Sequence, residues 1–210
     1  MKQVLETMSK IRLDLFSVGD YRPGGNRVLR IVWYLVGQRI LRSQLVTSYK
    51  FKSSLLRLFG AKIGTGLVIK PGVRVKYPWR LKVGNHVWIG EDAWIDNLEN
   101  VTVGSHSCLS QGVYLCTGNH DWRKPGFDYR LGRITIGTGA WIGAKSLVGP
   151  GLEIADYAIL TAGSVATRSL AAGRIYTGNP AAFVKYRWPE NSETEADVEL
   201  HENTALSRFN

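Results

Sequence analysis

A six-residue spacing of aliphatic residues runs through the middle of this chain and limits the folds that it can adopt. Fifteen positions follow the spacing, with two slips of two residues and one longer interruption, and fourteen of them are Val, Ile or Leu: Ile63, Ile69, Val75, Val83, Ile89, Ile95, Val103, Leu109, Leu115, Ile136, Ile142, Val148, Ile154, Leu160 and Ala166. An α-helix needs apolar residues every three to four positions, and a half-buried strand needs them every two. A period of six fits neither.

The period fits a chain that coils in triangular turns. Three hexads make one turn, each places an aliphatic side chain inside, and successive turns stack so that their short strands pair in parallel. Glycine relieves the backbone where a chain must turn, and it directly follows seven of the aliphatic positions: Gly64, Gly84, Gly90, Gly104, Gly137, Gly143 and Gly149. We therefore predict an all-β solenoid, a parallel β-helix of about five coils, over residues 60–170.

The segments on either side of the repeat differ from it. In the N-terminal segment, residues 1–59, apolar residues alternate with Arg27, Arg30, Arg39 and Arg42 in the pattern of a basic amphipathic helix. Such a helix can cap the open end of the solenoid, or it can lie on an anionic lipid surface. Residues 171–188 are expected to close the domain, and residues 189–210 to form a flexible acidic tail.

Charge limits the classes of partner. The chain has 27 Lys and Arg against 17 Asp and Glu, for a net charge of +10. Residues 189–210 carry six acids and one base; subtracting their −5 from +10 leaves +15 on residues 1–188. That surface favours anionic partners. No nucleic-acid-binding motif is present, so nucleic acid is not expected among them.

The sequence also limits the compartment. The N-terminus lacks an apolar signal-peptide core, and the longest apolar run, residues 31–36, is far too short to span a bilayer. Cys108 and Cys116 form no zinc or redox motif and are expected to be reduced thiols. We predict a cytoplasmic protein that is at most peripheral at the inner face of the membrane.

The long interruption of the repeat, residues 116–133, is the expected place for chemistry. It reads CTGNHDWRKPGFDYRLGR and contains His120, with Trp122, Phe127 and Tyr129 nearby. Loops that leave a rigid scaffold often carry function. His120 is therefore a candidate catalytic residue, and the alternative is an ordinary surface histidine.

Several motifs resemble those of the hexapeptide-repeat O-acetyltransferases. They are WIGA, the V-x-P-G turn at residues 148–151, AGSV-x-T and the closing GNPA. Upstream, KPGVRVKYPWRL, WIDNLENVTVG and LSQGVYLCTGNHD resemble the colanic-acid-biosynthesis branch of that family, and the likeness covers about residues 56–187. The resemblance implies a left-handed coil, acetyl-CoA as co-substrate, no metal, and a homotrimer with each CoA channel between two subunits.

The resemblance also implies roles for individual residues. His120 would be the general base that takes the proton of an acceptor hydroxyl. Small side chains would line the CoA channel, cations and a hydroxyl would lie near its adenosine-phosphate end, and Trp141 would lie near the thioester or against a neighbouring subunit. The cofactor-binding set is Ala144, Ala162, Thr167, Arg168, Lys185 and Trp141, and the expected acceptor contacts are Asp96, Asn97 and Trp122.

Other hypotheses about the substrate and the function stay open. The acceptor is expected to be a sugar or glycan precursor, with transfer to a hydroxyl, although the same site could N-acetylate an amino sugar. The γ-type carbonic anhydrases share the architecture but need three zinc-binding histidines. This chain has only His86, His106, His120 and His201, and no two stand five apart. A non-catalytic, membrane-associated scaffold is the remaining alternative.

Overall fold

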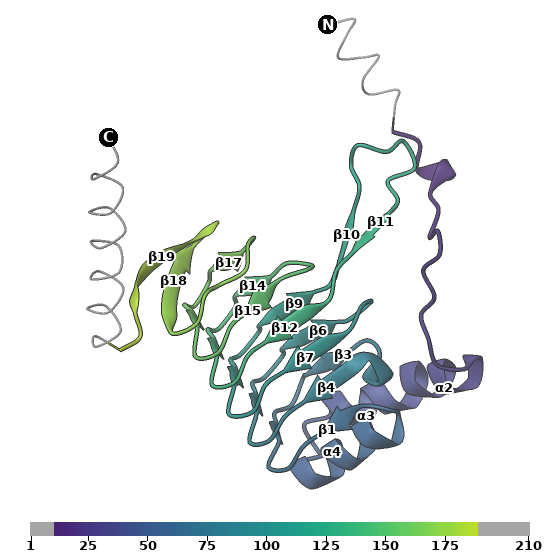
Figure 1. Cartoon of the computed structure of the whole chain (residues 1–210). Coiled ribbons are helices and arrows are strands. Elements are labelled where there is room, and N and C mark those ends of the chain that lie inside the picture. The colour runs from purple at the N-terminus through teal and green to yellow at the C-terminus, as the bar shows by residue number, and fades with distance from the viewer. Residues whose placement is uncertain (1–10, 189–210) are drawn as a thin grey trace, which may run out of the picture.

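The computed structural model describes residues 11–188, and the predicted acidic tail lies outside them. Figure 1 shows a solenoid of stacked triangular turns with helices at its N-terminal end and a hairpin that projects from its side. The fold is a left-handed parallel β-helix, as predicted.

Three sheets form the sides of the solenoid, and each of the five turns that the hexads define contributes one parallel strand to each sheet. The first sheet contains β1 (Lys62–Ile63), β4 (Leu81–Val83), β7 (Val101–Val103), β12 (Ile134–Ile136) and β15 (Glu153–Ile154). The second contains β2 (Val68–Ile69), β5 (Trp88–Ile89), β8 (Cys108–Leu109), β13 (Trp141–Ile142), β16 (Ile159–Leu160), β18 (Arg174–Gly178) and β19 (Ala181–Tyr186). The third contains β3 (Arg74–Val75), β6 (Trp94–Asp96), β9 (Tyr114–Cys116), β14 (Leu147–Val148) and β17 (Val165–Ala166).

The strand register stacks the predicted aliphatic positions into three interior columns. In the second sheet, for example, Ile69, Ile89, Leu109, Ile142 and Leu160 are successive partners, and each is at most 1% exposed. Each turn of a solenoid contacts only its neighbours, so the apolar area buried between successive turns is the main source of its stability. All fifteen predicted positions lie in strands of the three sheets, which confirms the repeat.

The number of turns differs slightly from the prediction. Beyond the five turns that the hexads define, Leu170 pairs with Ile154 and β18 pairs in parallel with β16, which begins a sixth turn. Leu170 stands four residues after Ala166 rather than six, so this turn leaves the register of the earlier hexads, although Tyr176 follows Leu170 by six and is also buried. β19 then folds back antiparallel on β18 and closes the C-terminal end.

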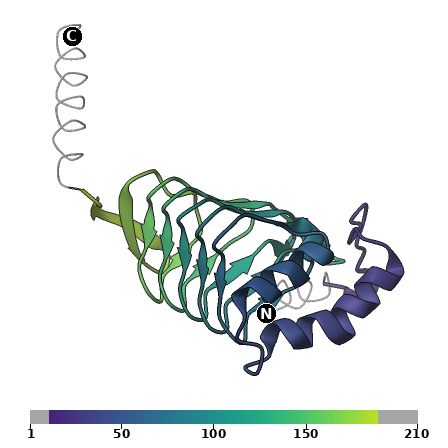
Figure 2. The same cartoon turned by 90° about the horizontal axis from the view of Figure 1, so that it is seen from below.

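Helices cover the other end of the solenoid (Figure 2). They are α2 (Arg27–Val32), the π-helix η2 (Trp33–Gly37), α3 (Gln38–Arg42) and α4 (Tyr49–Leu58). Trp33, Leu41, Leu56 and Phe59 are buried in the core of the solenoid, and the Trp33 indole N–H donates to the carbonyl of Val75 at 3.0 Å. The helices therefore cap the first turn. Within residues 11–188, none is both long enough and apolar enough to cross a membrane.

The interruption of the repeat forms an antiparallel hairpin of β10 (Gly118–His120) and β11 (Tyr129–Leu131). It leaves the solenoid at the corner between the third and first sheets. An N-terminal arm, residues 11–25 with the short 3-10 helix η1 (Leu13–Leu15), runs from the hairpin tip to α2 in Figure 1. The amide of Arg12 donates to the carbonyl of Pro125 at 2.8 Å, so the arm is bound to the hairpin. A second 3-10 helix, η3 (Pro78–Arg80), precedes β4.

Candidate active site

His120 ends β10, opposite Tyr129 of β11. Beyond it the chain turns, and this turn is closed by the amide of Asp121, which donates to the carbonyl of Asp128 at 2.8 Å. The hairpin thus holds His120 on a short two-stranded ribbon rather than on an unstructured loop.

The imidazole of His120 has one nitrogen engaged. Its Nδ1 lies 2.6 Å from the carbonyl oxygen of Phe127, and that oxygen can only accept a hydrogen bond. In the neutral ring, Nδ1 therefore carries the proton and Nε2 has the free lone pair. The Phe127 ring stacks on the imidazole with centroids 4.5 Å apart and planes at 10°, which fixes the ring's orientation. This arrangement suits a general base.

Two further aromatic rings surround His120. Phe16 of the N-terminal arm lies 5.8 Å from the imidazole between ring centroids, and Tyr129 lies 5.3 Å away. Phe16 also packs edge-on against Tyr129 at 5.1 Å. Phe16 could not be predicted from the sequence, because it lies outside the repeat and nothing in the spacing connects it to residue 120.

The two predicted acceptor residues at the end of β6 have different surroundings. The Asp96 carboxylate is bound by the Lys76 ammonium at 2.9 Å and by the Tyr114 hydroxyl at 3.2 Å. Burial, with Cys116 and Asp96 nearby, raises the pKa of Tyr114 far above its ordinary value. The Asn97 side chain is fully buried, and its amide makes two hydrogen bonds with the main chain of Tyr77, at 2.9 and 2.7 Å. Asn97 thus joins two turns of the solenoid.

Three of the predicted cofactor residues lie on the second sheet or at the corner that follows it. The Trp141 side chain is 46% exposed on the outer face of β13, and its indole N–H donates to the Ser110 hydroxyl at 2.9 Å. Ala144 and Ala162 occupy the corresponding turns of successive coils, which are joined by a hydrogen bond from the Gly163 amide to the Ala144 carbonyl at 2.8 Å. A larger side chain at Ala162, which is exposed, would project from this corner.

The remaining predicted site residues are spread over the surface. Thr167 and Asn119 line the same cavity of about 650 Å³, between the base of the hairpin and the turns that follow it. Arg168 and Lys185 are exposed beyond it, on the last turns. Trp122, 68% exposed, lies in the hairpin turn, with the Arg123 guanidinium 5.3 Å from its ring.

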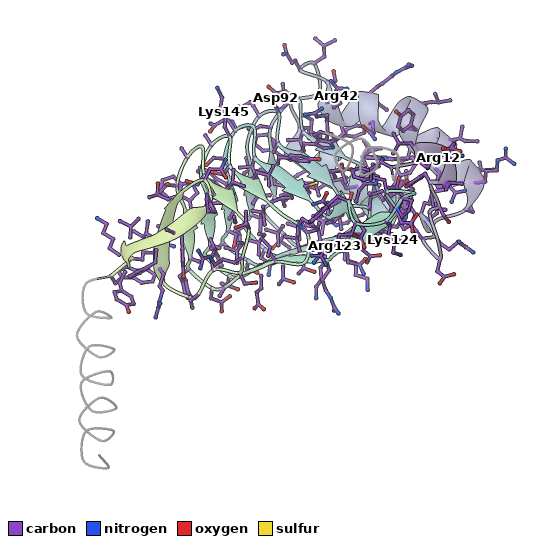
Figure 3. All side chains as sticks on the ribbon, turned by 90° about the horizontal axis from the view of Figure 1, so that it is seen from above. Arg12, Arg42, Asp92, Arg123, Lys124 and Lys145 are labelled. Atoms are coloured by element: carbon purple, nitrogen blue, oxygen red, sulfur yellow. The ribbon has the colours of Figure 1, made fainter. Side chains whose placement is uncertain are left out.

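One chain does not bring His120 together with the predicted cofactor residues Ala144 and Ala162, although Thr167 lies on the hairpin side. The hairpin leaves the corner between the third and first sheets, whereas Ala144 and Ala162 lie at the corner between the second and third. In Figure 3, Lys145, which follows Ala144, lies along one edge of the molecule, and Arg123 and Lys124 of the hairpin lie on the other. Among residues 11–188, no group of three His, Cys, Asp or Glu side chains is placed to hold a metal ion.

Comparison with known proteins identifies the family. No family model matches the chain. It is 38% identical over 175 residues to the Escherichia coli protein WcaF, which is assigned as an acetyltransferase of colanic acid biosynthesis; the match covers 83% of this chain and 96% of WcaF. It is 28% identical over 138 residues to the galactoside O-acetyltransferase of E. coli, across 64% of this chain and 68% of that enzyme.

Solved structures share the fold. A galactoside acetyltransferase in complex with coenzyme A superposes with a TM-score of 0.68 at 20% identity, over 79% of this chain and 84% of that one. A hexapeptide-repeat acetyltransferase from Vibrio cholerae, complexed with acetyl coenzyme A, gives 0.68 at 19% identity, over 76% and 87%. The repeat, the fold and the extended match to WcaF together show that the chain belongs to the hexapeptide-repeat acetyltransferases, in the branch of the colanic acid biosynthesis enzymes.

Proposed function

We propose that the protein transfers an acetyl group from acetyl-CoA to a hydroxyl of a sugar or glycan-precursor acceptor, with His120 as the general base. The observation that carries the proposal is the 2.6 Å contact between His120 Nδ1 and the Phe127 carbonyl, which leaves Nε2 as the basic nitrogen. Family membership supplies the reaction class, since the E. coli relatives are named acetyltransferases.

The proposed step is a direct transfer. Nε2 of His120 takes the proton of the acceptor hydroxyl as the oxygen attacks the carbonyl carbon of the thioester. The new C–O bond forms, the C–S bond breaks, and the departing CoA sulfur takes the proton back from the imidazolium. No acyl-enzyme forms, and the only group that changes protonation on the protein is His120.

The position of the residues supports a site shared between two chains. His120 and the Ala144–Ala162 corner belong to different edges of one solenoid, so a complete site needs the hairpin of one subunit and the corner of the next. A closed ring of three subunits provides three equivalent sites of this kind. We therefore propose a homotrimer in which Ala144, Ala162 and Trp141 bind the pantetheine arm, and Thr167, Arg168 and Lys185 lie near the adenosine phosphates.

The surroundings of His120 suit a sugar. Aromatic rings stack on the apolar faces of pyranoses, and Phe16, Tyr129 and the exposed Trp122 lie on the same arm and hairpin as the base. A carboxylate can accept hydrogen bonds from the hydroxyls of a sugar. Asp96 is therefore better suited to contact the sugar than Asn97, whose amide is already bonded to the main chain of Tyr77.

A screen for acetyl transfer tests this proposal. The full-length protein is incubated with acetyl-CoA and a panel of sugars and nucleotide sugars, and the release of the CoA thiol is followed. Wild type should release thiol only with a hydroxyl acceptor, and His120→Ala should lose that release while keeping CoA binding. Transfer to an amino sugar alone would replace O-acetylation by N-acetylation. Thiol release that His120→Ala leaves unchanged would remove His120 from the chemistry.

A further inference from the structure

The helical stretch of residues 27–42, formed by α2, η2 and α3, is called the cap helix below. One of its faces packs against the solenoid. Trp33, Gly37 and Leu41 are buried on that face. The Trp33 indole N–H also lies 3.1 Å from the carbonyl of Lys76, next to its bond with Val75. Capping the first turn requires this face only.

The opposite face of the cap helix is also apolar, although nothing among residues 11–188 covers it. Val28, Ile31, Val32 and Leu35 recur at the i, i+3, i+4 and i+7 positions of one helical stripe, and their exposed fractions are 69, 50, 41 and 50%. A surface helix of a globular protein places polar residues on its outer side. An exposed apolar stripe of this length is typical of a surface that binds a partner molecule or a membrane.

The charge of the cap helix and of the neighbouring α4 favours an anionic partner. Residues 26–58 contain no acidic residue and seven basic ones: Arg27, Arg30, Arg39, Arg42, Lys50, Lys52 and Arg57. None of these seven forms an ion pair with another side chain of residues 11–188. Glu91 and Asp92 share a surface pocket with Arg39 and Arg42, so the charge near Arg27 and Arg30 is the least compensated. Cations beside an exposed aliphatic stripe are typical of helices at the level of phospholipid headgroups.

A groove beside the stripe has the same chemistry. A cavity of about 320 Å³ lies between the cap helix and the first turns of the solenoid. Its apolar walls include Ile31, Tyr34, Leu35, Tyr77 and Trp79, and the cations Arg30 and Lys76 also line it. Lys76 is paired with Asp96, so Arg30 is the cation of this slot that can meet a phosphate. An apolar slot beside such a cation fits a phospholipid, whose acyl chain is apolar and whose phosphate is anionic.

We propose that the cap helix lies in the plane of an anionic phospholipid surface, with its outer stripe inserted among the acyl chains and its arginines at the headgroups. The stripe supplies the apolar area, and the arginines of the cap helix, above all Arg27 and Arg30, supply the preference for anionic lipid. The N-terminal arm joins this helix to the hairpin that carries His120 (Figure 1). This surface is independent of the acetyl-transfer proposal, and binding rather than activity tests it.

Co-sedimentation of the full-length protein with vesicles is the test. Vesicles of phosphatidylcholine alone are compared with an equal mixture of phosphatidylcholine and phosphatidylglycerol, at low and high salt. Wild type should bind the anionic vesicles and be released by salt. The double variant Ile31→Ser with Leu35→Ser should bind about tenfold more weakly, because two aliphatic anchors are lost. Arg27→Gln with Arg30→Gln should lose a similar factor on anionic vesicles.

A matched control removes exposed apolar residues from the other end of the solenoid. Phe183 and Val184 of β19 are 45 and 51% exposed, and replacing both with Ser should leave vesicle binding unchanged. Circular dichroism checks that each variant is folded. Equal binding of wild type and the Ile31/Leu35 variant, or no binding of wild type at low salt, overturns the proposal. Association of wild type into a larger species that the Ile31/Leu35 variant abolishes, without vesicle binding, would assign the stripe to a second copy of this chain.

Discussion

The imidazole of His120 and the main-chain oxygen of Phe127 are 2.6 Å apart, and the two side-chain rings stack with centroids 4.5 Å apart. Six residues of hairpin turn lie between them in sequence, so the turn itself sets the tautomer and the orientation of the ring. The hairpin therefore holds the proposed base in place before substrate binds.

Replacing His120 with Ala should lower turnover by about 10²- to 10⁴-fold, the usual contribution of a positioned general base. CoA binding should survive, because the proposed CoA contacts lie on the solenoid. Turnover and CoA affinity are measured together by thiol release and calorimetry. His86→Asn is the matched control: His86 adopts a left-handed φ of 54°, which Asn tolerates, and it lies outside the hairpin. Turnover of His120→Ala within twofold of wild type would contradict the assignment.

Mixed trimers test whether the site is shared. The proposed site joins the hairpin of one subunit to the Ala144–Ala162 corner of the next. His120→Ala removes the base from the hairpin half, and Ala162→Trp should block CoA at the corner half. After co-expression of the two inactive chains, complexes that contain both should show about a third of wild-type activity, because one of the three subunit pairs in each mixed trimer joins two intact halves. Activity of co-purified complexes, captured by two different tags, is the measurement. If each site lay within one chain, no activity would return.

Arg168→Glu should weaken acetyl-CoA binding by about tenfold, which corresponds to about 1.4 kcal/mol. The reversal places a carboxylate near the proposed phosphate end of the channel. The rise in melting temperature on adding acetyl-CoA reports the change. Lys62→Glu makes the same charge change on an exposed residue of the first turn and is the control. Equal stabilisation of both variants by acetyl-CoA would show that Arg168 lies elsewhere.

Ile142→Asp should unfold the solenoid. Ile142 is 0% exposed and lies in an interior column between Leu109 and Leu160, where a carboxylate would have no partner. The cost of several kcal/mol is comparable with the whole stability of a domain. Val184→Asp adds the same charge on an exposed strand and should melt like wild type. A folded Ile142→Asp protein with an unchanged melting temperature would contradict the register.

Cys108 should react slowly with alkylating agents. Burial raises the pKa of its thiol, so at pH 8 less of it is thiolate than in free cysteine, and the rate should rise as the pH increases further. Iodoacetamide labelling of a Cys116→Ser variant, followed by mass spectrometry, measures Cys108 alone. Labelling as fast as that of free cysteine would mean that the thiol is more exposed than the fold implies.

The sequence predicted the solenoid well and the site only partly, for a physical reason. An interior column repeats locally, so Ile142 or Leu160 can be recognised from neighbours six residues away. Phe16 packs on His120 from more than 100 residues away, and no periodicity records that contact. The sixth turn was missed because Leu170 follows Ala166 by four residues rather than six, which breaks the register of the earlier hexads.

Val103 and Ile136 are direct partners in the first sheet, although the whole hairpin lies between them in sequence. The turns before and after the insertion therefore stack as if nothing separated them, and the hairpin can change in length or composition without moving the columns below it. With the site as proposed, such a scaffold lets acceptor choice evolve separately from the acyl-donor half. Exchanging residues 118–131 between relatives should then transfer a preference for one acceptor to another, while the solenoid goes on folding as before.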